Sequence, residues 1–214
     1  MDVYHVGTGE KAVIVVYEVF GMESGRVKLI SDQLAHHGFQ VILPDFFRSD
    51  IFSGDWNNFK PWLFKFPWPK VKEDLQSKVL PFLHANGAKC IGMVGFCWGN
   101  WVVFHACAEL GDIKAGASAH PSAVKACEHF GEDVGEIIKE IHVPNLVLTA
   151  GNDPDSIKPG GVHAENLKKS GGEVDEYKEQ NHGWVTRGDL SDPKVEAAVK
   201  DATDKIIAFF KRHL

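Results

Sequence analysis

The sequence of 214 residues lacks the features that mark membrane, secreted and nucleic-acid-binding proteins. It has no apolar run of 18 residues, and residues 1–5 show no basic segment leading into an apolar one. We therefore expect a cytoplasmic protein with no membrane partner. Its net charge is −6 and its pI is about 6.0, which argues against nucleic acid as a partner.

Motifs for metals and nucleotides are also missing. The four cysteines form no C-x-x-C pair, so a zinc site is weakly supported and we expect no metal. The glycine-rich turn at residues 95–99 lacks the G-x-G-x-x-G pattern of dinucleotide-binding proteins. Residues 7–11 (G-T-G-E-K) have neither the glycine spacing nor the Ser/Thr of a P-loop. We expect no cofactor.

What remains is an ordinary globular composition, with 44% hydrophobic, 24% charged and 11% aromatic residues. This excludes a disordered or fibrous chain. A chain of this length buries enough surface to fold without a disulfide or a metal. We expect one domain, residues 1–214.

Short apolar segments alternate with longer amphipathic ones along the chain. Strands are predicted at residues 12–17, 39–43, 90–94, 115–119, 146–150 and, as a more polar edge strand, 173–178. Helices are predicted at residues 24–37, 71–84, 98–110, 162–169 and 193–214. The alternation predicts an α/β fold with a doubly wound, mostly parallel sheet. Ligands of such sheets bind beyond the carboxyl ends of the strands.

The aromatic-rich segment 51–69 interrupts this alternation. It contains seven of the chain's 23 aromatic residues, and Pro67 and Pro69 disfavour a long regular element there. One interpretation is a loop or short helix packed on the core. The other is an aromatic cap over a ligand pocket, in which Trp62 and Trp68 would contact the substrate.

A cysteine stands where a strand is predicted to turn into a helix. Gly95-Phe96-Cys97-Trp98-Gly99 is the cysteine version of G-x-S-x-G, the nucleophile elbow of α/β-hydrolases. Such a turn places the sulfur at a helix N-terminus, where the dipole favours a thiolate and the next N–H faces a developing oxyanion. The alternative is a structural cysteine in a glycine-rich turn.

Two further candidates follow later predicted strands. Asp153 follows the fifth strand and His182 the sixth, so that Cys97, Asp153 and His182 run in the order nucleophile, acid, histidine that α/β-hydrolases use. Asp155 is a second candidate for the acid, and we prefer Asp153 because it is nearer the strand end. The alternatives are a turn aspartate and a surface histidine.

Glu18 ends the first buried strand, where an ionised carboxylate needs a partner. It either caps the following helix or enters the active site beside Cys97.

Together these segments resemble the dienelactone hydrolase family of the α/β-hydrolase superfamily. The similarity spans residues 12–213 and is carried by four segments: Tyr17-Glu18-Val19-Phe20-Gly21, Leu43-Pro44-Asp45, Gly95-Phe96-Cys97-Trp98-Gly99 and Asn181-His182-Gly183-Trp184. Ala119-His120-Pro121-Ser122 resembles the subgroup found in fungi and other eukaryotes.

The resemblance implies hydrolysis of a lactone or carboxylic ester. Cys97 would attack the carbonyl, and His182, oriented by Asp153, would act as base and then as acid. The backbone N–H groups of Val19 and Trp98 would form the oxyanion hole. The resemblance also implies a small-molecule partner and a monomer or weak homodimer.

For Glu18, the resemblance implies a pairing with the resting thiol until substrate displaces it. Such a pairing would protect a cysteine that must stay unreacted until substrate arrives.

The chain departs from the family at several positions. Asn100 stands where the elbow usually has a second glycine. Bacterial members hold the substrate carboxylate with two arginines, and of the four arginines here only Arg187 is placed to match one. His120 is expected to line the pocket or to pack at its strand end.

A non-catalytic binding protein on the same fold is the main alternative, because fold does not determine function. A redox enzyme would need a resolving cysteine near Cys97. The combination of Cys97, Asp153, His182 and Glu18 favours a hydrolase, with lactonase, esterase and thioesterase activity left open.

Overall fold

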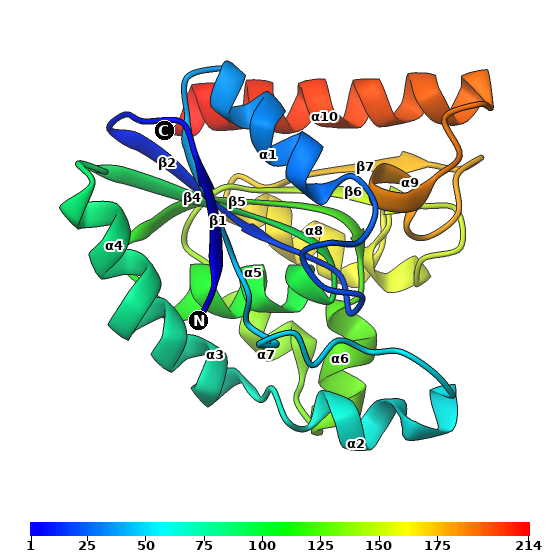
Figure 1. The fold of residues 1–214 in the computed structure, drawn as a ribbon. Helices are drawn as coiled ribbons and strands as arrows, with labels where there is room; N and C mark the ends of the chain where they lie inside the picture. Colours follow the sequence, from blue (N-terminus) through cyan, green and yellow to red (C-terminus); the bar gives the residue numbers. More distant parts are fainter.

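The computed structural model describes all 214 residues. Seven strands form one sheet in the order β1-β3-β2-β4-β5-β6-β7 (Figure 1). Only β1 runs antiparallel to its neighbour, β3. The predicted α/β fold with a mostly parallel sheet is thereby confirmed. The strands are β1 (Val3–Val6), β2 (Lys11–Val16), β3 (Gln40–Pro44), β4 (Cys90–Cys97), β5 (Ile113–Pro121), β6 (Asn145–Ala150) and β7 (Glu173–Tyr177).

The burial of each strand follows its composition. All residues of β3 and β6 are buried, as are all residues of β2 except Lys11. Helices cover both faces of a parallel sheet, so its inner strands are apolar on both sides. The edge strand β7 is the polar strand expected there. The other edge strand, β1, was not predicted, because its four half-exposed residues contain no apolar run.

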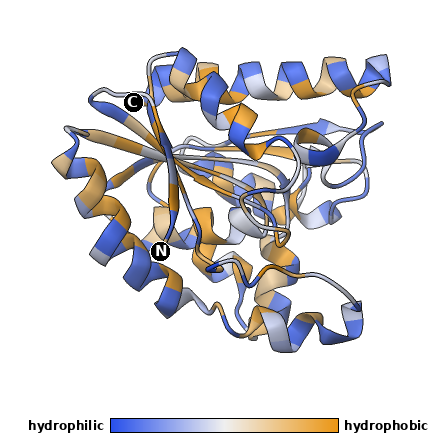
Figure 2. Ribbon diagram, in the orientation of Figure 1, coloured by the Kyte–Doolittle hydropathy of each residue, from blue (hydrophilic) through white to orange (hydrophobic).

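Helices cover the sheet on both faces (Figure 1). Helices α1 and α10 lie on one face, while α3, α4 and α5 lie on the other (Figure 1). The strands are largely hydrophobic, and the helices mix hydrophobic and hydrophilic residues (Figure 2). The helices are α1 (Val27–His36), α2 (Phe59–Leu63), α3 (Trp68–Asp74), α4 (Leu80–Ala85), α5 (Trp98–Glu109), α6 (Ala123–Phe130), α7 (Val134–Lys139), α8 (Val162–Lys169), α9 (Trp184–Arg187) and α10 (Pro193–His213).

One predicted helix differs in detail from the observed structure, and two observed helices were not predicted. The predicted helix 71–84 is α3 and α4 joined by a π-helical turn, Leu75–Val79. Pro81, near the start of α4, has no N–H to donate to the preceding turn, which favours such an irregularity. Helices α6 and α7 lie in a stretch for which no helix was predicted.

The aromatic segment 51–69 forms a short 3₁₀ turn (Trp56–Asn58), α2 and the start of α3. The Nε1 of Trp62 donates to the carbonyl of Asp50 at 2.7 Å, and its ring packs on Phe47. The Nε1 of Trp68 donates to Glu109 at 2.7 Å. Both tryptophans are buried, so this part of the segment is short helix packed on the core.

No helix in the structure has both the length and the apolar character needed to cross a membrane.

Candidate active site

Cys97 lies at the sharp turn between β4 and α5. Its φ of 54° is in the left-handed region, which is strained for a residue with a side chain. The two glycines of the elbow allow the turn. A Cβ at Gly95 would lie 2.2 Å from the carbonyl oxygen of Gly99, and one at Gly99 would lie 2.4 Å from that of Val16. The predicted nucleophile-elbow geometry is present.

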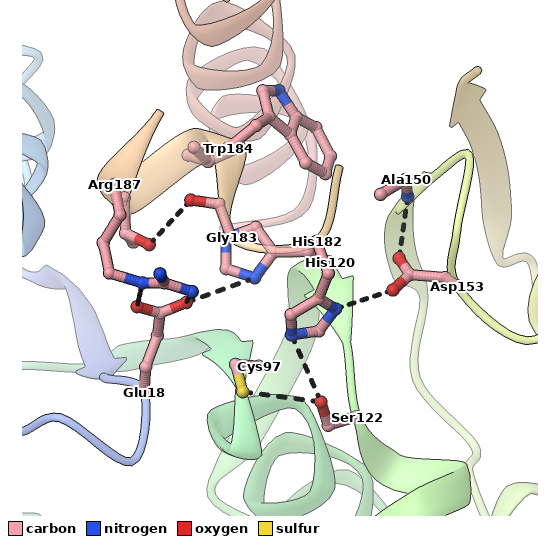
Figure 3. A network of polar contacts seen from close by, with 12 residues as sticks. Glu18, Cys97, His120, Ser122, Ala150, Asp153, His182, Gly183, Trp184 and Arg187 are labelled. Carbon is pink, nitrogen blue, oxygen red and sulfur yellow. Dashed lines mark hydrogen bonds and ion pairs between the residues drawn. The ribbon is translucent and has the colours of Figure 1, made fainter. Parts of the chain in front are cut away.

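His182 and Asp153 are paired, each in a turn after its strand. The Nδ1 of His182 lies 2.6 Å from Oδ1 of Asp153 (Figure 3). The other carboxylate oxygen of Asp153 accepts the N–H of Ala150 at 2.7 Å, which fixes its orientation. The second candidate acid, Asp155, points elsewhere, with a 98% exposed side chain that pairs with Lys158. The structure therefore brings Asp153, and not Asp155, to the histidine.

Ser122 stands between the cysteine and the histidine. Its Oγ donates to Sγ of Cys97 at 3.4 Å and lies 3.4 Å from Nε2 of His182 (Figure 3). Sequence reasoning did not single it out. The signal was its place directly after β5, at the same edge of the sheet as Cys97 and Asp153.

The pKa of His182 is raised from 6.5 to about 10. Burial alone would lower it. The hydrogen bond with Asp153 and the neighbouring Cys97 outweigh burial, because both stabilise the protonated ring. His182 is therefore an imidazolium at neutral pH.

The partner of Glu18 differs from the expectation. Its buried carboxylate pairs with Arg187, with Nε at 2.6 Å from Oε2 and Nη2 at 3.4 Å from Oε1 (Figure 3). A guanidinium offers a buried carboxylate two N–H donors and a full charge, which a thiol cannot. The expected pairing of Glu18 with the thiol of Cys97 is therefore not the arrangement found, since Sγ contacts Ser122 instead.

Arg187 is likewise engaged within the protein. Besides Glu18, its guanidinium contacts the ring of Phe20, 4.9 Å from the centroid. It lines the cavity beside Cys97, but its charge is already neutralised by Glu18.

His120 packs at its strand end. It is fully buried, and its ring lies 5.1 Å from that of His182 and 5.4 Å from that of Trp184. Its Nδ1 is 3.7 Å from Oε1 of Glu18. Burial, aided by the positive charges of His182 and Arg187, lowers its pKa well below the usual value, so the ring is neutral. His120 does not line the cavity.

A cavity of about 410 Å³ opens above Cys97. Cys97, Ser122 and His182 line it, together with Lys125 and His129 of α6. The aromatic residues of segment 51–69 that line it are Trp56 and Phe59. Trp62 and Trp68 do not, because their indole N–H groups are anchored in the core. One part of segment 51–69 is therefore packed on the core, and another part lines the cavity.

Two residues that line the cavity have a backbone N–H group without an acceptor. Trp98 is the first residue of α5, so its N–H has no partner within the helix. The N–H of Val19 makes no hydrogen bond in the structure. Both residues line the cavity.

No group of three or more His, Cys, Asp or Glu side chains in the structure could hold a metal ion.

Comparisons with known proteins agree with this geometry. The model of the dienelactone hydrolase family matches residues 1–214. The carboxymethylenebutenolidase homolog of Mus musculus is 30% identical over 214 residues, which cover 95% of this chain and 83% of that protein. The homolog of Homo sapiens is 29% identical with the same coverage.

Solved structures show the same fold. A putative dienelactone hydrolase from Klebsiella pneumoniae superimposes with a TM-score of 0.77 at 22% identity, covering 99% of this chain and 92% of that one. The chain belongs to the dienelactone hydrolase family.

Proposed function

We propose that the protein hydrolyses a small lactone or carboxylic ester, with Cys97 as nucleophile, His182 as base and acid, and Asp153 as the residue that orients the histidine. The observation that carries this is the placement of the thiol, the imidazole and the carboxylate in one cavity, with Nδ1 of His182 at 2.6 Å from Asp153.

The reaction divides into two steps. The thiolate of Cys97 adds to the carbonyl carbon, and collapse of the tetrahedral intermediate breaks the C–O bond while Nε2–H of His182 protonates the leaving alkoxide. The neutral imidazole then takes a proton from water, whose oxygen attacks the thioester. Collapse of the second intermediate releases the carboxylic acid and restores the thiolate and imidazolium.

The N–H groups of Val19 and Trp98 serve as the oxyanion hole. This assignment is supported because neither N–H group has an acceptor and because both residues line the cavity. Glu18 and Arg187 act as a pair that holds the segment with Val19 against α9, which fixes one of the two donors.

The cavity favours a substrate with an apolar or aromatic part. Phe20, Trp56 and Phe59 line it beside the exposed Lys125. Its volume of about 410 Å³ fits a small molecule. We propose that the chain works in the cytoplasm as one domain, as a monomer or weak homodimer, because a thiol nucleophile must stay reduced and every group named comes from a single chain.

The test is hydrolysis of an activated aryl ester, a dienelactone, a neutral lactone and a thioester by wild type, Cys97→Ala and Cys90→Ala. Cys90 is a matched control because it starts the strand that Cys97 ends. We expect wild type and Cys90→Ala to be equally active and Cys97→Ala to lose activity at least about a thousandfold. Equal activity of Cys97→Ala and wild type would exclude Cys97 as nucleophile.

Inactivity of the wild type on all four compounds favours the binding-protein alternative if iodoacetamide also fails to label Cys97. A labelled Cys97 indicates a reactive thiol with a substrate outside the panel.

A further inference from the structure

Ser122 occupies a helix-capping position without capping the helix. It is the N-cap residue of α6, where a serine hydroxyl normally accepts an N–H of the first turn. Its side chain makes no such bond. Instead its Oγ contacts Sγ of Cys97 and Nε2 of His182, both at 3.4 Å. The hydroxyl is thus directed into the active site at the expense of its usual role.

Asn100 takes over part of the capping. Its Oδ1 accepts the N–H of Ala123, the first residue of α6, at 3.0 Å. Its Nδ2 donates to Oγ of Ser118 at 2.9 Å, and the side chain is fully buried. A glycine at this position, which the family elbow usually has, would offer no acceptor to Ala123. Asn100 and the free hydroxyl of Ser122 therefore belong to one arrangement.

The backbone also places Ser122 over the thiol. His120 has a φ of 41° and Cys97 a φ of 54°, so the two neighbouring strand ends are both strained. The β4–β5 register shifts between Phe96 and Cys97. The N–H of Ser122 then donates to the carbonyl of Cys97 at 3.1 Å. This bond holds the serine backbone against the elbow.

The hydroxyl has one proton, which limits how it can serve both neighbours. When the hydroxyl donates to Sγ of Cys97, a contact that the 3.4 Å distance allows, it can only accept from Nε2 of His182. Because Nδ1 of His182 bonds to Asp153, a ring that donates from both nitrogens is the imidazolium. A thiolate is a stronger hydrogen-bond acceptor than a thiol. The arrangement Nε2–H···Oγ–H···Sγ therefore fits the charged form of the pair.

We propose that Ser122 is a further catalytic residue, whose hydroxyl bridges the thiolate of Cys97 and the imidazolium of His182 in the resting enzyme. Its part in hydrolysis rests on the proposed function. When the sulfur bonds to the carbonyl carbon it stops accepting, and Nε2–H is free to protonate the leaving alkoxide. When the thioester breaks, the hydroxyl again donates to the departing thiolate, and no atom or electron is gained or lost in the bridge.

Other titratable groups face the pair and stay unchanged in every variant below. They lie on β5, on the loops after β6 and β2, on α9 and on α6: His120, Asp153, Glu18, Arg187, Lys125 and His129.

The test measures the rate of Cys97 alkylation by iodoacetamide against pH, in a Cys90→Ala background that leaves Cys97 as the only thiol that is not buried. Ser122→Ala and Ser122→Gly remove the hydroxyl, Ser122→Thr retains it, and Ser77→Ala is the control at an exposed serine. We expect the midpoint of the profile to rise by about one pH unit in the Ala and Gly variants, the size of one charge-assisted hydrogen bond. The Thr and control variants should match the parent.

If the alkylation profiles of all variants are the same, the proposed bridging role of the Ser122 hydroxyl is wrong. It is also wrong if the Thr variant behaves as the Ala variant does, because that result indicates packing rather than the hydroxyl. Two hydroxyl-free variants guard against loss of folding, and glycine is tolerated at an N-cap. If the wild type hydrolyses no ester, the proposed function is wrong but the proposed role of Ser122 is still tested. The alkylation rates measure the contact between Ser122 and Cys97 without any substrate.

Discussion

The carboxylate of Glu18 is held by the guanidinium of Arg187 across 169 positions of sequence, with Nε and Oε2 2.6 Å apart. The two side chains differ in exposure, at 3% for Glu18 and 37% for Arg187. The pair ties the loop after β2 to α9. It thereby joins the residue that precedes Val19 to the helix that follows His182.

Removal of Arg187 should cost more stability than removal of both charges. Arg187→Met leaves a buried carboxylate without a cation, and we expect a loss of about 2 kcal/mol in the free energy of unfolding, allowing for the partly exposed guanidinium. The double variant, with Glu18→Gln added to Arg187→Met, should regain much of the lost stability, because a neutral amide needs no cation. Urea denaturation measures both variants.

The control for this pair is Arg212→Met, which breaks an exposed ion pair with Glu173. It should change stability by less than about 1 kcal/mol. A double variant no more stable than Arg187→Met would contradict the reasoning.

The raised pKa of His182 predicts a late alkaline limb in the pH profile of hydrolysis. The protonated ring is needed to protonate the leaving alkoxide, and with a pKa of about 10 it keeps its proton across neutral pH. We expect kcat/KM to hold steady between pH 7 and 9 and to fall near pH 10. Asp153→Asn removes the carboxylate whose hydrogen bond raises the pKa of His182, so the alkaline limb should move toward pH 6.5. A wild-type limb already near pH 7 would show that the pKa of His182 is not raised in the free enzyme.

The two aromatic groups of segment 51–69 should respond differently to truncation. Phe59→Ala opens the cavity wall and should raise KM for an aryl ester about tenfold with little effect on stability. Trp62→Ala creates a void in the core and should destabilise the fold by about 3–5 kcal/mol. Steady-state kinetics and thermal unfolding of both variants separate these roles. An unchanged KM in Phe59→Ala would remove this ring from substrate binding.

That difference marks the limit of sequence reasoning for this chain. The apolar runs of β2 to β6 were predictable because burial on both faces of a parallel sheet demands them. The thiol, the acid and the histidine were predictable because each follows a strand. Which of seven clustered aromatics faces the cavity depends on where single indole N–H groups find acceptors, such as Asp50 and Glu109. No local pattern encodes those distant partners.

The partner of Glu18 was missed for a related reason. A buried carboxylate takes the strongest cation within reach, and Arg187 comes within reach only after the whole sheet is assembled. Ser122 was missed because a serine before a helix is expected to cap it. Only the structure shows that its hydroxyl contacts Cys97 and His182 instead.

Asn100 should therefore contribute to stability and to the site together. Asn100→Ala leaves the N–H of Ala123 without its acceptor and Oγ of Ser118 without its donor, both in the interior. We expect a loss of about 2–4 kcal/mol in the free energy of unfolding, measured by urea denaturation. Asn86→Ala, at the exposed end of α4, is the control and should change it by less than about 1 kcal/mol. The bond to Ala123 also holds the backbone next to Ser122, so its loss should displace the Ser122 hydroxyl and raise the midpoint of Cys97 alkylation. A destabilised variant with an unshifted midpoint would separate Asn100 from the orientation of Ser122 and leave it a structural residue alone.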